Sequence, residues 1–133
     1  MPSSTGSILI IDQEPTIVAL LVEILTDAGY VAYPAPDGTR ALTAIAHLLP
    51  ALVILDVGCP SRRGAELLEA IRAAVLATTP IVVMTTEPYD AAALLALGAV
   101  ACLVKPFDLD ELLACVARAV QPSTYDTQPT AAA

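Results

Sequence analysis

Short apolar segments rich in β-branched residues alternate along this chain with longer segments in which apolar residues recur with helical period. The short segments are too brief for helices, and most are bounded by Gly, Pro or Asp, so each predicts a strand. Strict alternation of strands and helices predicts an α/β fold with a parallel sheet, because each parallel connection needs a long right-handed crossover. The five predicted strands are Ser7–Ile11, Val31–Tyr33, Leu52–Leu55, Ile81–Met84 and Val100–Val104.

Residues that start or stop helices delimit the intervening segments. Pro15 suits the first position of a helix, and Gly29 suits the position just after its end. The remaining four helices are predicted by similar signals. The second helix begins after Asp37 and ends by Pro50, and the third covers residues 64–77. The fourth lies between Pro88 and Gly98, and the fifth runs from a capping box of Asp108 and Glu111 to before Pro122.

The length of 133 residues is that of a single domain. Hydrophobic residues make up 56% of the chain and charged residues 15%, a balance that predicts a sizeable core rather than disorder. We expect residues 1–6 to be a flexible N-terminus and residues 7–120 to be the folded domain. Residues 121–133 show no period, which predicts a disordered tail or the stub of a linker.

Charge and composition exclude several classes of function. The net charge of -8 argues against direct nucleic-acid binding, which needs a positive face, and favours basic partners or bound cations. The first residues lack the pattern of a signal peptide, and the apolar run Ala91–Val104 is shorter than the roughly 18 residues of a membrane span. Cys59, Cys102 and Cys115 lack zinc-site spacing and predict reduced thiols. We therefore expect a cytoplasmic protein.

Four chemically active side chains stand where predicted strands end. Asp12 follows the first strand, Asp56 the third, Thr85 the fourth, and Lys105, the only lysine in the chain, the fifth. In an open parallel sheet the ligand site lies outside the carboxyl ends of the strands. The topology therefore predicts that two carboxylates, a hydroxyl and an ammonium group gather at one edge.

This set of groups favours phosphoryl chemistry. Two carboxylates suit a hard divalent cation such as Mg²⁺, and a nearby ammonium suits an anion that arrives with the metal. Transfer of a phosphoryl group needs little beyond positioning and charge stabilisation, and one carboxylate is a candidate nucleophile that would form an aspartyl phosphate. Any one of these residues also suits a turn, a cap or a solvated surface, but their shared edge favours a site.

The segments "ILIIDQEP", "LVILDVGCPSRRGAELLEAIR", "IVVMTT" and "GAVACLVKPF" resemble, in order and spacing, the receiver domain of bacterial two-component response regulators. The resemblance covers about residues 7 to 120. It implies a flavodoxin-like doubly wound sheet of five parallel strands in the order 2-1-3-4-5, with five helices. It also implies a cytoplasmic phosphoprotein that signals rather than acts as an enzyme, with a sensor histidine kinase or phosphotransfer protein as phosphodonor.

The same resemblance assigns roles to individual residues. Asp56 would be the phosphoacceptor and, with Asp12, a ligand of Mg²⁺, while Gly58 would offer its backbone carbonyl to the metal. Thr85 would hydrogen-bond a phosphoryl oxygen, and Lys105 would neutralise another. The resemblance further implies a cis peptide bond between Lys105 and Pro106, since cis bonds occur almost only before proline.

Gln13 departs from this pattern, because the family commonly has a second acidic residue there as a metal ligand. A unit charge at about 4 Å is worth about 4 kcal/mol at an effective dielectric near 20, so its loss predicts weak magnesium binding that Gln13→Asp would strengthen. The Gln13 amide and the adjacent Glu14 remain candidate ligands. Alternatively, Gln13 and Glu14 only begin the loop and cap the helix that starts at Pro15.

Two further positions also differ from the pattern. Thr86 stands beside Thr85 where a smaller residue is common, and it is a candidate for phosphoryl binding. Its side chain would narrow access to the acyl phosphate and slow the hydrolysis of that group. Cys102 stands where the family often has an aromatic ring that moves inward on phosphorylation. The coupling of Thr85 to an aromatic switch therefore cannot operate in that form, and we expect altered or absent signal output.

The segment "YDAAALLALG" has no charged side chain between Asp90 and Gly98. Together with Leu112, Leu113 and Val116 of the last helix, it predicts an apolar surface for a homodimer or a downstream protein partner. The alanines are equally explained as good helix formers on an ordinary surface.

The sequence thus supports two functions. The first is a receiver domain that accepts a phosphoryl group on Asp56. The second is a pseudo-receiver, an interaction module with lapsed phosphorylation, favoured by Gln13 and Cys102. A flavin-binding protein of similar topology is excluded, because "DQEP" is acidic where a phosphate-binding loop should present backbone amides.

Overall fold

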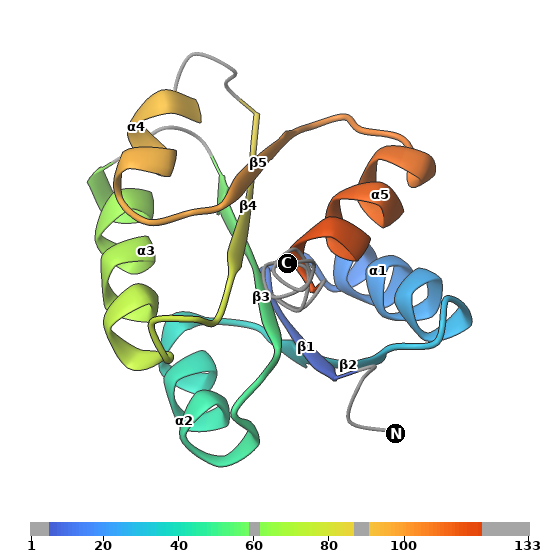
Figure 1. Cartoon of the computed structure of the whole chain (residues 1–133), viewed down its shortest axis with the longest axis horizontal. Helices are drawn as coiled ribbons and strands as arrows, with labels where there is room; N and C mark the ends of the chain where they lie inside the picture. Colours follow the sequence, from blue (N-terminus) through green and yellow to red (C-terminus); the bar gives the residue numbers. More distant parts are fainter. Residues whose placement is uncertain (1–5, 59–61, 87–90, 121–133) are drawn as a thin grey trace, which may run out of the picture.

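The structure is a computed structural model that describes residues 6–58, 62–86 and 91–120. In these ranges, five parallel strands form one sheet in the order β2-β1-β3-β4-β5, and five helices flank it (Figure 1). The strands are β1 (Ser7–Ile11), β2 (Val31–Ala35), β3 (Leu52–Gly58), β4 (Ile81–Thr85) and β5 (Ala101–Val104). The helices are α1 (Pro15–Asp27), α2 (Gly38–Leu48), α3 (Arg62–Ala74), α4 (Ala91–Ala96) and α5 (Leu109–Ala119). The predicted flavodoxin-like order is confirmed.

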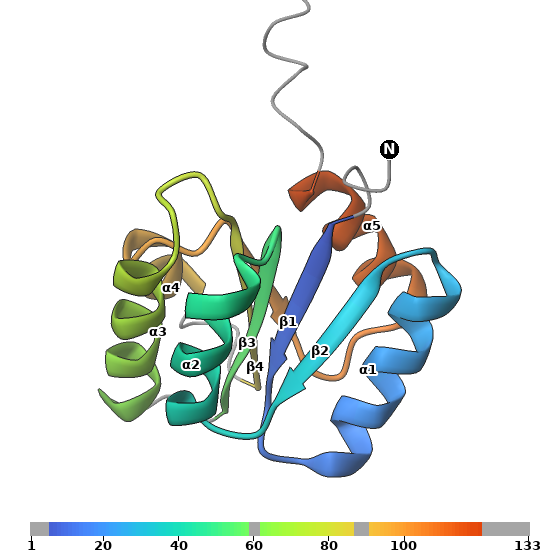
Figure 2. The ribbon, with the colours of Figure 1, turned by 90° about the horizontal axis from the view of Figure 1, so that it is seen from below.

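The helices form two layers, one on each face of the sheet. Helices α1 and α5 cover one face, and α2, α3 and α4 cover the other (Figures 1 and 2). Neighbouring residues of β1 enter different layers: Ile8 and Ile10 pack on the side of α1 and α5, whereas Leu9 and Ile11 pack on the opposite side. Both faces of the central strands are therefore buried, which explains why their sequences are continuously apolar.

Strand β2 runs two residues further than predicted and includes Pro34. The Ala35 carbonyl accepts a hydrogen bond from the Asp12 N–H, so Ala35 points its backbone groups toward β1. Because these groups alternate in direction along a strand, Pro34 directs its missing N–H toward the open edge of the sheet. The proline is thus compatible with this edge strand and blocks pairing with a further strand.

The predicted helix signals mostly act as expected. The Asp37 side chain accepts a hydrogen bond from the Arg40 N–H as the N-cap of α2, and Asp108 and Glu111 form the predicted capping box of α5. Gly29 follows the end of α1 with a positive φ of 102°. Helix α4 starts at Ala91, while the predicted start at Pro88 lies outside the described residues.

Helix α3 begins two residues earlier than predicted, so Gly64 lies in its first turn. A Cβ at Gly64 would meet the Val57 carbonyl oxygen at 2.8 Å. The glycine therefore lets the start of α3 pack directly against the end of β3, where any side chain would force the two apart.

None of the helices in the described ranges is long and apolar enough to cross a membrane. Neither Cys102 nor Cys115 forms a disulfide with another described residue, and Cys59 lies outside the described residues. The predicted N-terminus (except Gly6) and the predicted tail also lie outside the described ranges.

Candidate functional site

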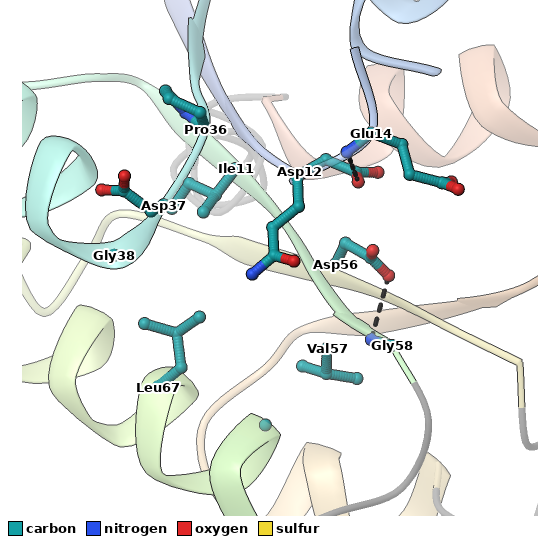
Figure 3. A pocket seen from close by; sticks show the side chains of 12 residues that line it. Ile11, Asp12, Glu14, Pro36, Asp37, Gly38, Asp56, Val57, Gly58 and Leu67 are labelled. Carbon is teal, nitrogen blue, oxygen red and sulfur yellow. Dashed lines mark hydrogen bonds between the residues drawn. The ribbon is translucent and has the colours of Figure 1, made fainter. Parts of the chain in front are cut away.

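A cleft of about 360 Å³ opens at the carboxyl ends of β1 and β3 (Figure 3). Its walls come from the loop after β1, the loop before α2 and the start of α3. Of the predicted site residues, Asp12, Gln13, Glu14, Asp56 and Gly58 line it.

The strand order brings the charged residues together. Ile11 of β1 is paired with Leu55 of β3, so the next residues, Asp12 and Asp56, emerge side by side. The Lys105 Nζ lies 3.2 Å from Asp56 Oδ1 and 3.8 Å from Asp12 Oδ2. The peptide bond between Lys105 and Pro106 is cis, as the resemblance implied. The predicted gathering of two carboxylates around the single lysine is therefore present.

Each carboxylate is held by the backbone two residues further on. The Glu14 N–H donates a hydrogen bond of 3.0 Å to Asp12 Oδ1, and the Gly58 N–H donates one of 3.0 Å to Asp56 Oδ1 (Figure 3). Such local side-chain to backbone bonds are typical of aspartate in turns. They fix both carboxylates before any ligand arrives.

The end of β3 carries an irregularity that the sequence pattern did not predict. Asp56 is paired with Met84 but Gly58 with Thr85, so Val57 is an extra residue in this ladder. Gly58 has a positive φ of 66°, a conformation that glycine adopts readily. A strand predicted to end at Leu55 thus continues to Gly58, and the irregularity directs the Gly58 N–H toward Asp56.

Thr85 is fully buried at the end of β4, and its hydroxyl donates to the Gly58 carbonyl at 3.4 Å. The backbone N–H of Lys105 donates to the Thr85 carbonyl. These contacts join the ends of β3, β4 and β5, so the predicted hydroxyl, carboxylate and ammonium belong to one connected edge.

Asp12 is the most deeply buried charged group of the site, with 3% of its surface exposed. Burial raises the pKa of its carboxyl above the ordinary value, and the charge of Asp56 acts in the same direction. The hydrogen bond from Glu14 and the charge of Lys105 act in the opposite direction and only partly compensate. The Asp12 Oδ2 atom is buried and has no hydrogen-bond partner within the described residues.

We expect Asp12→Asn to stabilise the fold at pH 7 without magnesium. When the pKa of a carboxyl is higher in the folded state, stability falls as pH rises from the unfolded-state pKa to the folded-state pKa. The raised pKa of Asp12 therefore means that its ionised form destabilises the fold at pH 7. The free energy of unfolding of Asp12→Asn, measured by urea denaturation at pH 7, should therefore exceed that of the wild type. Glu23→Gln, an exposed change on α1 with the same change of charge, is the control. A loss of stability in Asp12→Asn would contradict this reading.

The site fits a divalent cation. A buried carboxylate oxygen without a hydrogen-bond donor lies at the cleft beside a second carboxylate, and oxygen ligands of this kind suit Mg²⁺. No group of three or more His, Cys, Asp or Glu residues gathers in the parts of the chain that the structure describes. A cation would therefore depend on two carboxylates together with backbone, amide or water oxygens.

The other predicted site residues are placed differently. Gln13 and Glu14 are exposed at the cleft, and Figure 3 shows the Glu14 side chain extending away from the Asp56 carboxylate. Thr86 is exposed and lines a second, mostly apolar groove of about 530 Å³ between α1 and the start of α5, which Lys105 also borders. Cys102 is half-buried and packs against the layer of α2, α3 and α4.

Sequence reasoning missed the far wall of the cleft. Pro36, Asp37 and Gly38 from the start of α2, with Leu67 from α3, line it opposite the carboxylates. A Cβ at Gly38 would meet the Leu67 side chain at 2.9 Å, so the glycine allows α2 and α3 to pack closely here. Only Asp37 gave a sequence signal, and that signal was for a helix cap.

The prediction that Leu112, Leu113 and Val116 of the last helix form part of an apolar surface is wrong. Leu112 and Val116 are buried against the sheet, and Leu113 is partly buried beside them, because these residues form the inner face of α5. The large apolar side chains that are exposed in this region are Leu95 on α4, 44% exposed, Val100 before β5, 53% exposed, and Leu109 at the start of α5, 48% exposed.

Comparisons with known proteins agree with this geometry. The sequence matches the response regulator receiver domain over residues 8–117. It is 38% identical over 119 residues to the transcriptional regulatory protein KdpE of Mycobacterium tuberculosis, covering 88% of this chain and 52% of KdpE. Two similar solved structures are the chemotaxis protein CheY4 of Vibrio cholerae and the BeF3-activated receiver domain of Klebsiella pneumoniae RstA. Their identities are 33% and 25%, and their TM-scores are 0.76 and 0.77. The matches cover 86% and 87% of this chain, and 98% and 99% of theirs.

The fold and the site thus define a flavodoxin-like signalling domain, and the chain belongs to the family of response regulator receiver domains. The predicted resemblance is confirmed. The chain spans about half the length of the curated relatives it matches.

Proposed function

We propose that this receiver domain accepts a phosphoryl group on Asp56 and passes the signal on through protein contacts. The observation that carries the proposal is the contact of Lys105 with both Asp56 and Asp12 at the edge of the sheet. A side-chain oxygen of Asp56 attacks phosphorus, the bond from phosphorus to the donor breaks, and an acyl phosphate forms. The electron pair of the broken bond leaves with the donor.

The residues around Asp56 support this reaction by position and charge. The Gly58 N–H holds the Asp56 carboxylate in a fixed orientation, and Lys105 offers a positive charge to the phosphoryl oxygens. The Thr85 hydroxyl, now directed at the Gly58 carbonyl, is close enough to the same edge to rotate toward a phosphoryl oxygen. Thr86 is an additional candidate contact from the groove beside Lys105.

Asp12, Asp56 and the Gly58 carbonyl are the groups that would hold Mg²⁺. When bound, Mg²⁺ supplies positive charge that offsets the negative charge of the transferred group. Asp12 Oδ2 supports this assignment, because this buried oxygen has no hydrogen-bond partner among the described residues and only the Lys105 ammonium at 3.8 Å beside it.

A sensor histidine kinase or a phosphotransfer protein is the proposed donor, and a protein partner the proposed receiver of the signal. The alternative of a pseudo-receiver makes the opposite prediction at Asp56, namely no phosphoryl addition. Intact mass after incubation with Mg²⁺ and a small-molecule phosphodonor separates the two, and the matched variant is Asp56→Asn.

We propose that Leu95 and Val100 contribute to the output contact, with a second copy of this chain as one candidate partner. Their exposure on neighbouring segments supports this proposal, because removal of large apolar side chains from water into an interface is favourable in free energy. We expect phosphorylated protein to show a sedimentation coefficient that rises with concentration, and Val100→Ser to weaken the association severalfold. Leu49→Ser, which changes an exposed leucine after α2, is the control. A monomer at all concentrations would exclude self-association and leave a different protein as the partner.

A further inference from the structure

The cation pocket is short of negative charge. Two carboxylates, Asp12 and Asp56, contact one ammonium group, Lys105, so the three groups together carry a charge of about -1 when ionised. Gln13 shares the cleft but brings only a neutral amide. Glu14 brings a carboxylate, but its side chain extends away from Asp56, and only its backbone N–H bonds to Asp12 (Figure 3).

A divalent cation that enters this pocket meets an ammonium group already on both carboxylates. The Lys105 Nζ at 3.8 Å from Asp12 Oδ2 repels a cation that approaches the same oxygen. A phosphoryl group changes this balance, because its oxygens add negative charge and give Lys105 a new partner. Asp12 and Asp56 are then freer to face the cation.

We infer that Gln13 makes occupancy by Mg²⁺ depend on the phosphoryl group, so that metal and phosphodonor bind cooperatively instead of metal first. This inference rests on the proposed function and specifies how the same site is regulated. A carboxylate at position 13 would supply the missing charge and let Mg²⁺ bind on its own. By linkage, the metal strengthens binding of the phosphoryl group by the same factor as the phosphoryl group strengthens binding of the metal.

The experiment is calorimetric titration of Mg²⁺ into the full chain at constant ionic strength, with and without beryllofluoride. Beryllofluoride bonds to a carboxylate oxygen and imitates the phosphoryl group. We expect it to lower the Kd of Mg²⁺ for the wild-type chain by at least about tenfold. Without beryllofluoride, we expect Gln13→Asp to bind Mg²⁺ at least about tenfold more tightly than the wild type.

Gln13→Asn is the matched control, because it alters the side chain at the same exposed position without adding charge. It should bind Mg²⁺ like the wild type. Equal affinity of the wild type and Gln13→Asp without beryllofluoride, or no effect of beryllofluoride on the wild type, overturns the inference. So does a fall in Mg²⁺ affinity of about tenfold in Glu14→Gln, since Glu14 would then supply the charge.

The proposed function fails in a different way. If Asp56 gains no mass from a phosphodonor at saturating Mg²⁺, and Gln13→Asp gains none either, phosphoryl acceptance itself is excluded. If Asp56 is phosphorylated but Mg²⁺ binds the wild type tightly without beryllofluoride, the proposed function stands and the cooperative binding of metal and phosphodonor is excluded.

Discussion

Asp56→Asn is expected to abolish phosphoryl addition completely. Incubation of the wild-type chain with Mg²⁺ and a small-molecule phosphodonor should add the mass of one phosphoryl group, and the variant should gain none. The physical reason is that an amide cannot act as the oxygen nucleophile, although it preserves size and can still accept the hydrogen bond from Gly58. Intact mass spectrometry gives the result directly.

The matched control is Asp37→Asn, which changes an exposed carboxylate that lines the far wall of the same cleft. Asparagine is also a good N-cap, so α2 should remain intact. This variant should be labelled like the wild type. Labelling of Asp56→Asn would show that the phosphoacceptor is another residue, and absence of labelling in the wild type would favour the pseudo-receiver.

Lys105→Met should slow phosphorylation of Asp56 by roughly 100-fold or more, the loss typical when one group that stabilises transition-state charge is removed. Methionine retains much of the aliphatic length of lysine but leaves the Asp12 and Asp56 carboxylates without a shared cation. The rate of mass gain at a fixed phosphodonor concentration is the measurement. Circular dichroism establishes that the variant is folded before rates are compared.

Arg118→Met is the control for Lys105→Met, because it removes one positive charge from the exposed last turn of α5. It should leave the rate within about twofold of the wild type, since exposed distant charges are screened by salt. If both variants slow the reaction equally, the effect of Lys105 is one of net charge and its position at Asp56 carries no special role.

The strand ends were the most predictable part of the site. Asp12, Asp56, Thr85 and Lys105 each follow an apolar segment, and the rule that ligands bind at the carboxyl ends of parallel strands needs no knowledge of side-chain contacts. Register confirms why this works: β1 lies beside β3, and β3 beside β4, so residues at the ends of these strands are neighbours. The bounds of the elements were less predictable, as the extension of β2 through Pro34 and the start of α3 at Arg62 demonstrate.

The error on α5 has a simple physical origin. Leu112 and Val116 were predicted to be exposed because α4 lacked a polar face, but a helix that covers a sheet must bury one apolar stripe of its own. Which stripe faces the sheet depends on the rotation of the helix. The capping box fixes where α5 starts, but only packing against β5 and α1 fixes its rotation.

The sequence by itself determined the order of strands and helices, the parallel sheet and the residues at the carboxyl ends of its strands. These follow from local properties, namely the period of apolar residues and the residues that end each segment. Only the tertiary structure decided the distances from Lys105 to the two carboxylates, the burial of Asp12, the irregularity at Val57 and the direction of the Glu14 side chain. Such features depend on how segments far apart in the chain pack together, and pairwise packing leaves no periodic pattern along the sequence.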